Sequence, residues 1–436
     1  MKLTIKKYGI NGEGIAYDRK IPVFIKGALK NEEVEARLLK SFGSYRTAAL
    51  GRIYEASPER KNIDCPYFDR CGACSLMHAT YQEQLAIKAE ILEESLRKYA
   101  DIHLPFEIIE NDVPVGYRNL LKMPVGDEHG KLVCGFYPEG SNRFATVPHC
   151  LIHEPLLEEK KNEVLKVLNS HHLRPYDRHS KKGIRYLVMR TIGGNISLCL
   201  VTGEGKVSES LIQDLKKIEG ITSAYQSVNT TRGKEVFGRL FYHLYGGKYL
   251  TFKYDGLKLA LSTRAFYQLN TKQAEKLYAL VEEKIGENNN LVVEAYAGIG
   301  VMSMLAARRS KKAIGVEIVQ EAVYDATRSA KVNRLDNVEF VCDDSRSYLN
   351  DNLKKRTIDL LIVDPPRSGL DEKMIDAIMS SNIKRIIYVS CSPSSLSQNL
   401  SDLQAKYEVE SIDAVDIFTN TAHLETVAVL ARKSCR

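Results

Sequence analysis

The sequence predicts a multidomain α/β protein that ends in a doubly wound parallel sheet, and three observations point to this class. The chain has 436 residues, more than a single ordinary core holds, so we expect two or three domains. From about residue 290 onwards, apolar strand-like runs alternate with helical segments, as in parallel sheets covered by helices. The first 55 residues instead carry short runs with period-two character, which indicates a small all-β unit.

Composition restricts the class further. Hydrophobic residues make up 44% and charged residues 27% of the chain, as in folded globular proteins. There is no run of about 18 apolar residues and no signal-peptide core, so we expect a cytoplasmic protein without a membrane span. A formal net charge of +7 permits a polyanionic partner such as RNA but does not require one. The odd number of cysteines, nine, argues against a disulfide framework and favours metal binding or catalysis.

Residues 1–56 are predicted to form a small OB-like β-barrel. Strand-like runs at 3–5, 23–25 and 33–38 are separated by glycine turns, and a barrel is the natural closure for such short strands. Basic residues recur along this part of the chain, and both a solvated surface and a nucleic-acid platform fit them. They are Lys6, Lys7, Arg19, Lys20, Lys26, Arg37, Lys40 and Arg46.

The strongest metal signal is a group of three cysteines within ten residues, Cys65, Cys71 and Cys74, to which Cys150 can add a fourth ligand. Two residues separate Cys71 from Cys74, so both thiolates can reach one ion or cluster, and Gly72 eases the turn between them. Four thiolates suit either zinc or an iron–sulfur cluster. The five-residue first gap and the isolated fourth cysteine favour a cluster, while zinc and scattered buried thiols remain alternatives.

A mixed α+β region follows the cysteines, so the predicted central domain covers 57–250. An amphipathic helix is expected over about 81–99, with four apolar residues on one side, Leu85, Ala89, Leu92 and Leu96. Strands, hairpins and one or two helices are expected from 106 to 250.

The third predicted domain, 251–436, carries a cofactor signal. Gly298 and Gly300 let a ligand approach the backbone closely at the first strand-to-helix turn. Glu317 ends the second predicted strand, where a carboxylate can accept hydrogen bonds from both hydroxyls of a ribose. A dinucleotide fingerprint needs a third glycine at position 303, and that residue is Ser303. The pattern therefore favours S-adenosylmethionine over NAD.

Two motifs follow later strands of the same predicted sheet. Asp364 begins an Asp-Pro-Pro-Arg sequence, in which two prolines fix an extended loop and Arg367 can hold a carboxylate or phosphate. Cys391 follows the apolar run 386–389 at the sheet edge where open α/β folds bind ligands. A nucleophile and a buried structural thiol are both compatible with this position.

A candidate base lies near the end of the chain. Glu425 precedes the final predicted strand, and His423 is the alternative base because its usual pKa is nearest neutrality. A thiolate and a carboxylate near a methyl donor suggest one reaction. The thiolate adds to C6 of a uracil ring, C5 takes the methyl group, a base removes the C5 proton, and the thiolate leaves. Ordinary polar residues at the start of a strand are the simpler alternative for both candidate bases.

Together these motifs resemble the RNA 5-methyluridine methyltransferase family over nearly the whole chain. In chain order, the cysteine set is followed by Phe266-Tyr-Gln268-Leu-Asn270, Glu294-Ala-Tyr296-Ala-Gly298-Ile-Gly300, Asp364-Pro-Pro-Arg367, Ser390-Cys391-Ser-Pro393 and His423-Leu-Glu425. The resemblance implies a TRAM domain for the barrel and a class I (Rossmann-like) methyltransferase domain at 251–436, onto which the helix at 80–100 packs. Glu294 and Val301 depart from the usual family residues, and no role is transferred to Val301.

The resemblance also implies roles for individual residues. Cys391 would be the nucleophile and Glu425 the base. The residues implied to contact S-adenosylmethionine are Gln268, Tyr296, Glu317, Asp344 and Asp364. The residues implied to hold a [4Fe–4S] cluster are Cys65, Cys71, Cys74 and Cys150.

The substrate follows from the same resemblance. The cluster-bearing branch of the family mostly modifies large-subunit ribosomal RNA, whereas the transfer-RNA branch typically lacks the TRAM domain and the cluster. A uridine of 23S rRNA is therefore the expected substrate, and we expect a monomer. Three alternatives stay open: the same reaction on a T-loop uridine of tRNA, cytosine 5-methylation, and an iron–sulfur RNA-binding protein without activity.

Overall fold

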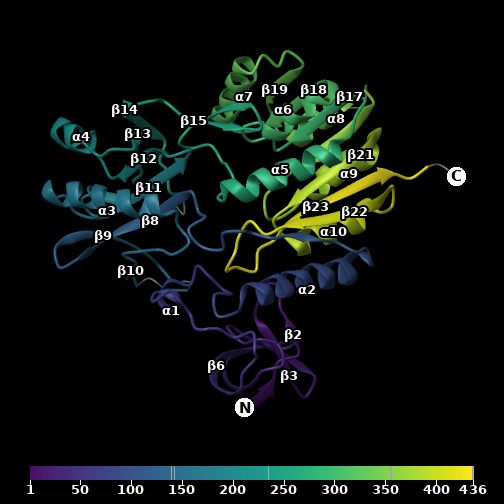
Figure 1. The fold of residues 1–436 in the computed structure, drawn as a ribbon, viewed down its shortest axis with the longest axis horizontal. Helices are drawn as coiled ribbons and strands as arrows, with labels where there is room; N and C mark the ends of the chain where they lie inside the picture. The colour runs from purple at the N-terminus through teal and green to yellow at the C-terminus, as the bar shows by residue number, and fades with distance from the viewer. Residues whose placement is uncertain (139, 142, 234, 354–355, 435–436) are drawn as a thin grey trace.

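The computed structural model describes residues 1–138, 140–141, 143–233, 235–353 and 356–434. Its strands form sheets of six, seven and eight strands and one two-stranded hairpin. The six-stranded sheet lies at one end of the molecule, and the two larger sheets lie beside each other beyond it (Figure 1). None of the helices in this described part of the chain combines the length and apolar character that crossing a membrane requires.

The N-terminal sheet closes on itself. Its strand order is β1-β5-β6-β4-β3-β2, so both outer strands come from the same short segment, residues 2–8. The segment pairs with β5 before Ile5 and with β3 after it, which joins the two edges into a barrel. The strands are β1 (Lys2–Thr4), β2 (Lys7–Tyr8), β3 (Gly14–Asp18), β4 (Ile21–Ile25), β5 (Glu33–Ser41) and β6 (Arg46–Glu55).

The seven-stranded sheet is covered on one face by helices α3 (Pro155–Ser170) and α4 (Glu209–Leu215). Leu157 and Val164 of α3 pack there against Leu121 and Leu187 of the sheet. The strand order is β10-β9-β8-β11-β12-β13-β14. The strands are β8 (Leu120–Glu128), β9 (Lys131–Phe136), β10 (Ala145–Thr146), β11 (Ile184–Ile192), β12 (Asn195–Thr202), β13 (Ile221–Val228) and β14 (Leu240–Gly246).

The eight-stranded sheet is the predicted doubly wound sheet, with strand order β19-β18-β17-β20-β21-β23-β22-β7. Its first five members are parallel, and β23 lies antiparallel between β21 and β22. Its strands are β7 (Ile108–Ile109), β17 (Asn289–Ala295), β18 (Ser310–Glu317), β19 (Val338–Cys342), β20 (Ile358–Val363), β21 (Ile383–Ser390), β22 (Tyr407–Val415) and β23 (Glu425–Arg432). The prediction of a multidomain α/β fold is confirmed.

Helices and a hairpin complete this part of the molecule. Alternate residues of β23 enter two different cores, Val427 and Val429 in one and Ala428 and Leu430 in the other, so both faces of the sheet are covered. The hairpin consists of β15 (Leu250–Tyr254) and β16 (Leu257–Leu261). The helices are α5 (Thr271–Ile285), α6 (Val301–Arg308), α7 (Gln320–Val332), α8 (Ser345–Leu353), α9 (Glu372–Ser380) and α10 (Pro393–Leu403).

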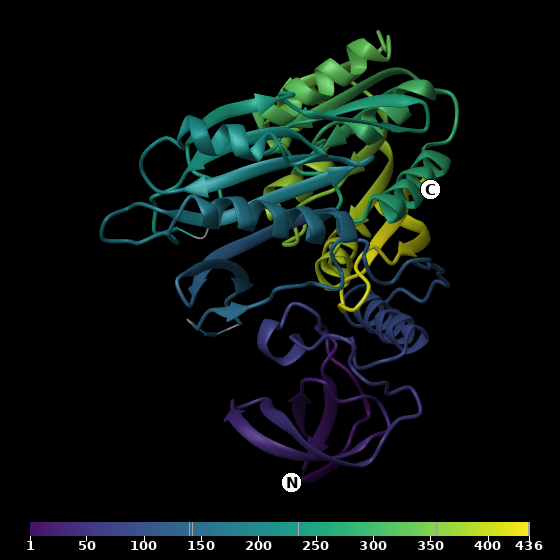
Figure 2. The same cartoon turned by 60° about the vertical axis from the view of Figure 1, so that its left-hand side comes forward.

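A long helix, α2 (Tyr81–Ala100), lies between the barrel and the eight-stranded sheet (Figure 2). It begins at Thr80, whose side chain accepts a hydrogen bond from the Glu83 backbone N–H. Leu92 and Leu96 belong to the core of the eight-stranded sheet. Ile87 and Ile91, on another side of the helix, pack instead in a cluster that includes Tyr8 and Leu29 of the barrel region. The following strand β7 joins the C-terminal sheet as well, although it falls inside the interval 57–250 assigned to the central domain.

Candidate active site at the edge of the C-terminal sheet

Most of the predicted site residues meet at one edge of the eight-stranded sheet. Strands β17 to β21 are parallel, so their carboxyl ends share that edge. The antiparallel strand β23 begins at the same edge with Glu425. The predicted residues that end or follow the parallel strands there are Tyr296, Glu317, Asp344, Asp364 and Cys391.

The first turn at this edge leaves open space for a ligand. Gly298 and Gly300 have φ angles of 54° and 76°, in the left-handed region that favours glycine. A side chain at Gly300 would lie 2.3 Å from the Phe340 ring, whereas one at Gly298 would meet no atom within 4 Å. Tyr296 also has a positive φ of 64°, an unusual conformation that tends to occur at functional sites.

Glu317 is tied to this turn. One of its carboxylate oxygens, Oε2, accepts a hydrogen bond of 2.9 Å from the Gly298 backbone N–H, and Oε1 accepts one of 2.8 Å from Val319. The carboxylate therefore sits beside the glycine turn with its orientation fixed by backbone donors, as a ribose-binding carboxylate requires.

The serine at the third-glycine position has a contact of its own. The Ser303 hydroxyl donates a hydrogen bond to the buried Glu294 carboxylate. Burial raises the pKa of Glu294 to about 8, so this carboxyl is largely protonated at neutral pH. Glu294, which differs from the usual family residue, thus has the Ser303 hydroxyl as a hydrogen-bond partner.

Two predicted cofactor residues differ in setting from the others. Asp344 Oδ1 accepts hydrogen bonds from the Ser347 N–H and hydroxyl, so it caps the first turn of α8. Gln268 is buried in the connection between β16 and α5 rather than at a strand end, and its backbone carbonyl accepts a hydrogen bond of 2.9 Å from Asn119. Two residues later, Asn270 donates to the Ile417 carbonyl, just before β23.

The register of β21 and β23 brings the proposed nucleophile and base together. Ser390 pairs with Thr426 across these strands, so the next pair along is Cys391 and Glu425. Burial and the charges of Glu425 and Asp364 raise the pKa of the Cys391 thiol to about 11. Burial and the charge of Asp364 also raise the pKa of Glu425 far above its usual range. The free site therefore favours protonated groups at neutral pH.

His423 behaves differently from Glu425. Its Nδ1 lies 3.3 Å from the Arg367 guanidinium. Burial and that positive charge lower the pKa of His423 to about 4, so the imidazole is uncharged and a weak base. Between the two bases considered from the sequence, the geometry favours Glu425.

The four cysteines predicted as metal ligands line one cavity of about 140 Å³. Cys71 ends the short helix α1 (Phe68–Cys71), and Gly72 caps this helix in the left-handed conformation, with a φ of 70°. Within the described ranges, no group of three or more histidine, cysteine, aspartate or glutamate side chains is arranged to hold a single metal ion. The remaining lining includes Tyr67, Phe68, Met77, Arg118, Lys122 and Phe136.

A doubly wound sheet with a glycine turn and a carboxylate held beside it at one edge is typical of the class of S-adenosylmethionine-dependent methyltransferases. The family model for tRNA (uracil-5-)-methyltransferase matches residues 247–433. A Bacillus cereus protein described as an uncharacterized RNA methyltransferase is 33% identical, with 99% of this chain and 96% of that protein covered. A relative in Caldanaerobacter subterraneus with the same description is 34% identical, with 99% and 98% covered.

Among solved structures, Pyrococcus abyssi tRNA (uracil-54, C5)-methyltransferase in complex with S-adenosyl-L-homocysteine has the same fold. The TM-score is 0.80 at 22% identity, with 99% of this chain and 100% of that chain covered. The chain belongs to the family of RNA (uracil-5-)-methyltransferases. It is an enzyme that methylates uracil C5 in RNA and takes the methyl group from S-adenosylmethionine.

Proposed function

We propose that this enzyme methylates C5 of a uridine in 23S rRNA, with Cys391 as nucleophile and Glu425 as base. The observation that carries the proposal is the juxtaposition of these two residues across the β21–β23 pair, at the edge that holds the glycine turn. A nucleophile that attacks C6 and a base that removes the C5 proton act on adjacent atoms of one small ring, so they need this kind of proximity.

In the proposed reaction, the Cys391 thiolate forms a bond to C6 of the uracil, and the ring's π electrons move to C5 and O4. S-adenosylmethionine supplies the methyl group that C5 then takes. The Glu425 carboxylate removes the C5 proton, the C5–C6 double bond re-forms, and the bond between Cys391 and C6 breaks with release of the thiolate. A thiol with a raised pKa stays protonated until substrate binding changes its surroundings, which protects it from side reactions.

The proposed cofactor contacts follow the sheet edge. Glu317 is suited to the ribose hydroxyls, and the open space beside Gly298 admits a ligand close to the backbone. Tyr296 and Asp364 flank that position on the adjacent strands β17 and β20. The full proposed set is Gln268, Tyr296, Glu317, Asp344 and Asp364.

We also propose that Cys65, Cys71, Cys74 and Cys150 hold a [4Fe–4S] cluster. All four cysteines line the same cavity, as ligands of one shared group would. Methyl transfer needs no electron, so the expected role of the cluster is structural or RNA-positioning.

The three-domain division extends the proposal. Residues 1–56 would be a TRAM domain that binds RNA, 57–250 the cluster-bearing domain and 251–436 the methyltransferase domain. Two contacts between a basic and an aromatic side chain beside the seven-stranded sheet support RNA binding. Lys122 lies 5.4 Å from the Phe237 ring centre, and Arg264 lies 5.4 Å from that of Phe241.

Transfer RNA remains the second candidate substrate. The solved Pyrococcus abyssi enzyme acts on uracil 54 of tRNA and shares the fold over its full length, the barrel region included. Possession of a barrel therefore does not separate a ribosomal-RNA enzyme from a tRNA enzyme. Cytosine 5-methylation would use a thiolate as well, and the contexts Asp364-Pro-Pro-Arg367 and His423-Leu-Glu425, which resemble the uridine enzymes, count against it. A purely RNA-binding role would leave the cofactor turn without use.

The test is methyl transfer from labelled S-adenosylmethionine to unmethylated 23S rRNA and to tRNA in parallel, using anaerobically purified protein. The modified base is then identified by mass spectrometry. We expect 5-methyluridine in the ribosomal RNA. Label in tRNA alone would keep the mechanism and change the substrate. Detection of 5-methylcytosine would show that the methylated nucleobase is not uracil. No label in either RNA, with the cluster intact, would favour an RNA-binding protein without activity.

A further inference from the structure

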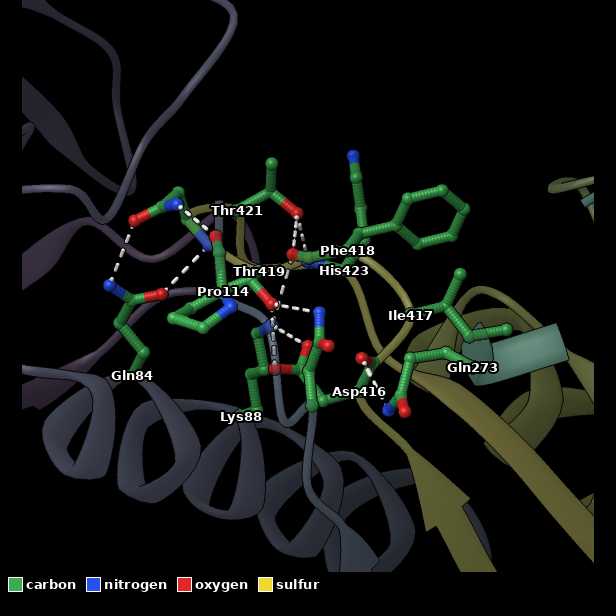
Figure 3. Close-up of polar contacts among 12 residues, drawn as sticks. Gln84, Lys88, Pro114, Gln273, Asp416, Ile417, Phe418, Thr419, Thr421 and His423 are labelled. Atoms are coloured by element: carbon green, nitrogen blue, oxygen red, sulfur yellow. Dashed lines mark hydrogen bonds and ion pairs between the residues drawn. The ribbon is translucent and has the colours of Figure 1, made fainter. Parts of the chain in front are cut away.

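The loop that leads into Glu425 is held by residues from distant parts of the chain. Residues 416–424 join β22 to β23 and end immediately before the proposed base. At the start of the loop, Asp416 forms a fully buried ion pair with Lys88 of α2 (Figure 3). The Gln273 side chain of α5 donates to the Asp416 carbonyl at 3.0 Å. The start of the loop is thus fixed from two helices.

The middle of the loop contacts the cysteine-bearing segment. The Asn420 carbonyl accepts hydrogen bonds from the backbone N–H groups of Ser75 and Leu76, at 2.9 and 3.0 Å. These two residues directly follow Cys74. The neighbouring Thr419 carbonyl accepts a hydrogen bond of 2.8 Å from the Tyr117 hydroxyl, and Tyr117 packs in the same apolar cluster as Cys74.

The Asn420 side chain fixes the same point from a second direction. Its Oδ1 accepts a hydrogen bond of 3.1 Å from Gln84 of α2, while its backbone N–H donates to Gln84 Oε1 at 2.7 Å. Its Nδ2 donates to the Pro114 carbonyl at 3.1 Å. Asn420 is 4% exposed and has a φ of 66°, a left-handed conformation that asparagine tolerates better than most residues.

We propose that Asn420 is a positioning residue for proton removal, through which α2 and the segment after Cys74 orient the Glu425 carboxylate relative to Cys391. The inference rests on the proposed role of Glu425 as base. Every hydrogen-bonding group of Asn420 is used between elements that belong to different parts of the molecule, and Glu425 lies only five residues further on. Since reaction rates depend steeply on the placement of a base, release of this loop lowers the rate of the step that needs the base.

The mechanism provides a readout specific to that step. Thiolate addition and methyl transfer precede proton removal, so a base that is out of place leaves RNA covalently joined to Cys391 through C6. This complex survives denaturation and can be counted on a gel. A variant that only weakens folding or RNA binding lowers the amount of all species and does not accumulate the complex.

The experiment compares Asn420→Gly, which keeps the left-handed backbone but loses the amide, with Gln84→Leu, which removes the partner on α2. Gln82→Leu, the same change at an exposed position of α2, is the matched control. We expect kcat to fall about 10- to 100-fold in the first two, with KM for RNA within about twofold and the covalent complex accumulating. The Gln82→Leu protein should behave as the unmodified enzyme.

A Glu425→Gln protein tests the role of Glu425 as base separately from the positioning role of Asn420. If it fails to accumulate the complex, the proposed base is wrong. If it accumulates the complex while Asn420→Gly and Gln84→Leu do not, although both are folded by circular dichroism, the positioning role of Asn420 is overturned. A rise in KM without a fall in kcat would overturn it equally.

Discussion

Cys391 and Glu425 each lie one residue beyond Ser390 and Thr426, the last partners in the antiparallel ladder of β21 and β23. The end of this ladder keeps the two backbones at a set separation as long as the strands stay together, and both strands are buried in the sheet. The distance between nucleophile and base is thus set by sheet pairing rather than by the conformation of a flexible loop. The loop before Glu425 sets only the final orientation of the carboxylate.

Replacing Cys391 by alanine is expected to abolish methyl transfer, because Cys342, the other described thiol at this edge, ends the outermost strand β19, four strands away from β21. The loss should reach at least about 10⁴-fold, as for other nucleophiles that act within a unit. Binding of S-adenosylmethionine should stay within about threefold, since Cys391 is not a proposed cofactor contact. Unchanged methyl transfer by Cys391→Ala would exclude the covalent mechanism.

The rate should rise with pH. The nucleophile must lose a proton, and the pKa of its thiol is raised to about 11, so the thiolate fraction grows tenfold per pH unit below that value. Glu425, whose pKa is also raised, must likewise be deprotonated. We expect log kcat/KM to increase between pH 6 and 9 with a slope of at least one, rising toward two where Glu425 also titrates in this range.

Arg367 provides the control for this profile. Its positive charge lowers the pKa of Cys391, so Arg367→Gln should move the whole profile to higher pH. A profile that is flat from pH 6 to 9 would contradict the expectation that Cys391 is a protonated thiol in the free enzyme.

The two glycines of the cofactor turn should respond differently to alanine. Gly300→Ala brings a methyl group to within 2.3 Å of the Phe340 ring and should lower the melting temperature markedly. Gly298→Ala meets no protein atom and should cost only the roughly 1–2 kcal/mol of a left-handed alanine. It should nevertheless weaken S-adenosylmethionine binding about tenfold or more in calorimetry, because the methyl group occupies the open space. Unchanged affinity would place the cofactor elsewhere.

The Lys88–Asp416 ion pair should be costly to break. Both side chains are fully buried, so Lys88→Met leaves Asp416 without its counter-charge and should lower the free energy of unfolding by about 3–5 kcal/mol. The matched control is Arg97→Met on the same helix, where the pair with Glu94 is exposed and the expected loss is below about 1 kcal/mol. Equal losses in urea denaturation would mean that burial of the pair is irrelevant to stability.

Iron content tests the four proposed cluster ligands. Cys65→Ser, Cys71→Ser, Cys74→Ser and Cys150→Ser should each lose most of the iron and the visible absorbance of anaerobically purified protein. Cys342→Ser changes an exposed thiol outside the cavity and should keep both. Zinc in place of iron by elemental analysis would revise the group, and iron retained in Cys150→Ser would remove that residue from the ligand set.

Sequence patterns predicted the elements that carry the chemistry. The apolar run before Cys391 and the runs before Glu317 and Asp364 are strands in the structure, because long buried parallel strands have an unmistakable composition. The helix expected over 81–99 is α2, which extends one residue further. The sequence also predicted a final strand directly after Glu425; this strand is β23, which begins at Glu425 itself and pairs with β21.

What the sequence did not reveal depends on distant pairings. Strand β7 has two residues and helix α1 has four, which is too short for any periodicity. Asn420 was not singled out, since its partners Gln84 and Ser75 lie more than 300 residues earlier and only the fold brings them together. His423 was an equal candidate by residue type, and only its burial beside Arg367 disfavours it.

The insertion of β23 between β21 and β22 has a consequence for synthesis of the chain. The last strand along the described sequence enters the interior of the sheet, so the sheet cannot be completed until the chain has been made through Arg432. The Asn420 contacts with Ser75 likewise wait for residues made hundreds of positions later. The position between β21 and β22 therefore stays empty until β23 has been made, and folding is expected to be slow. Until β23 inserts between β21 and β22, a nascent chain therefore cannot bind RNA in a way that leads to reaction at a uracil.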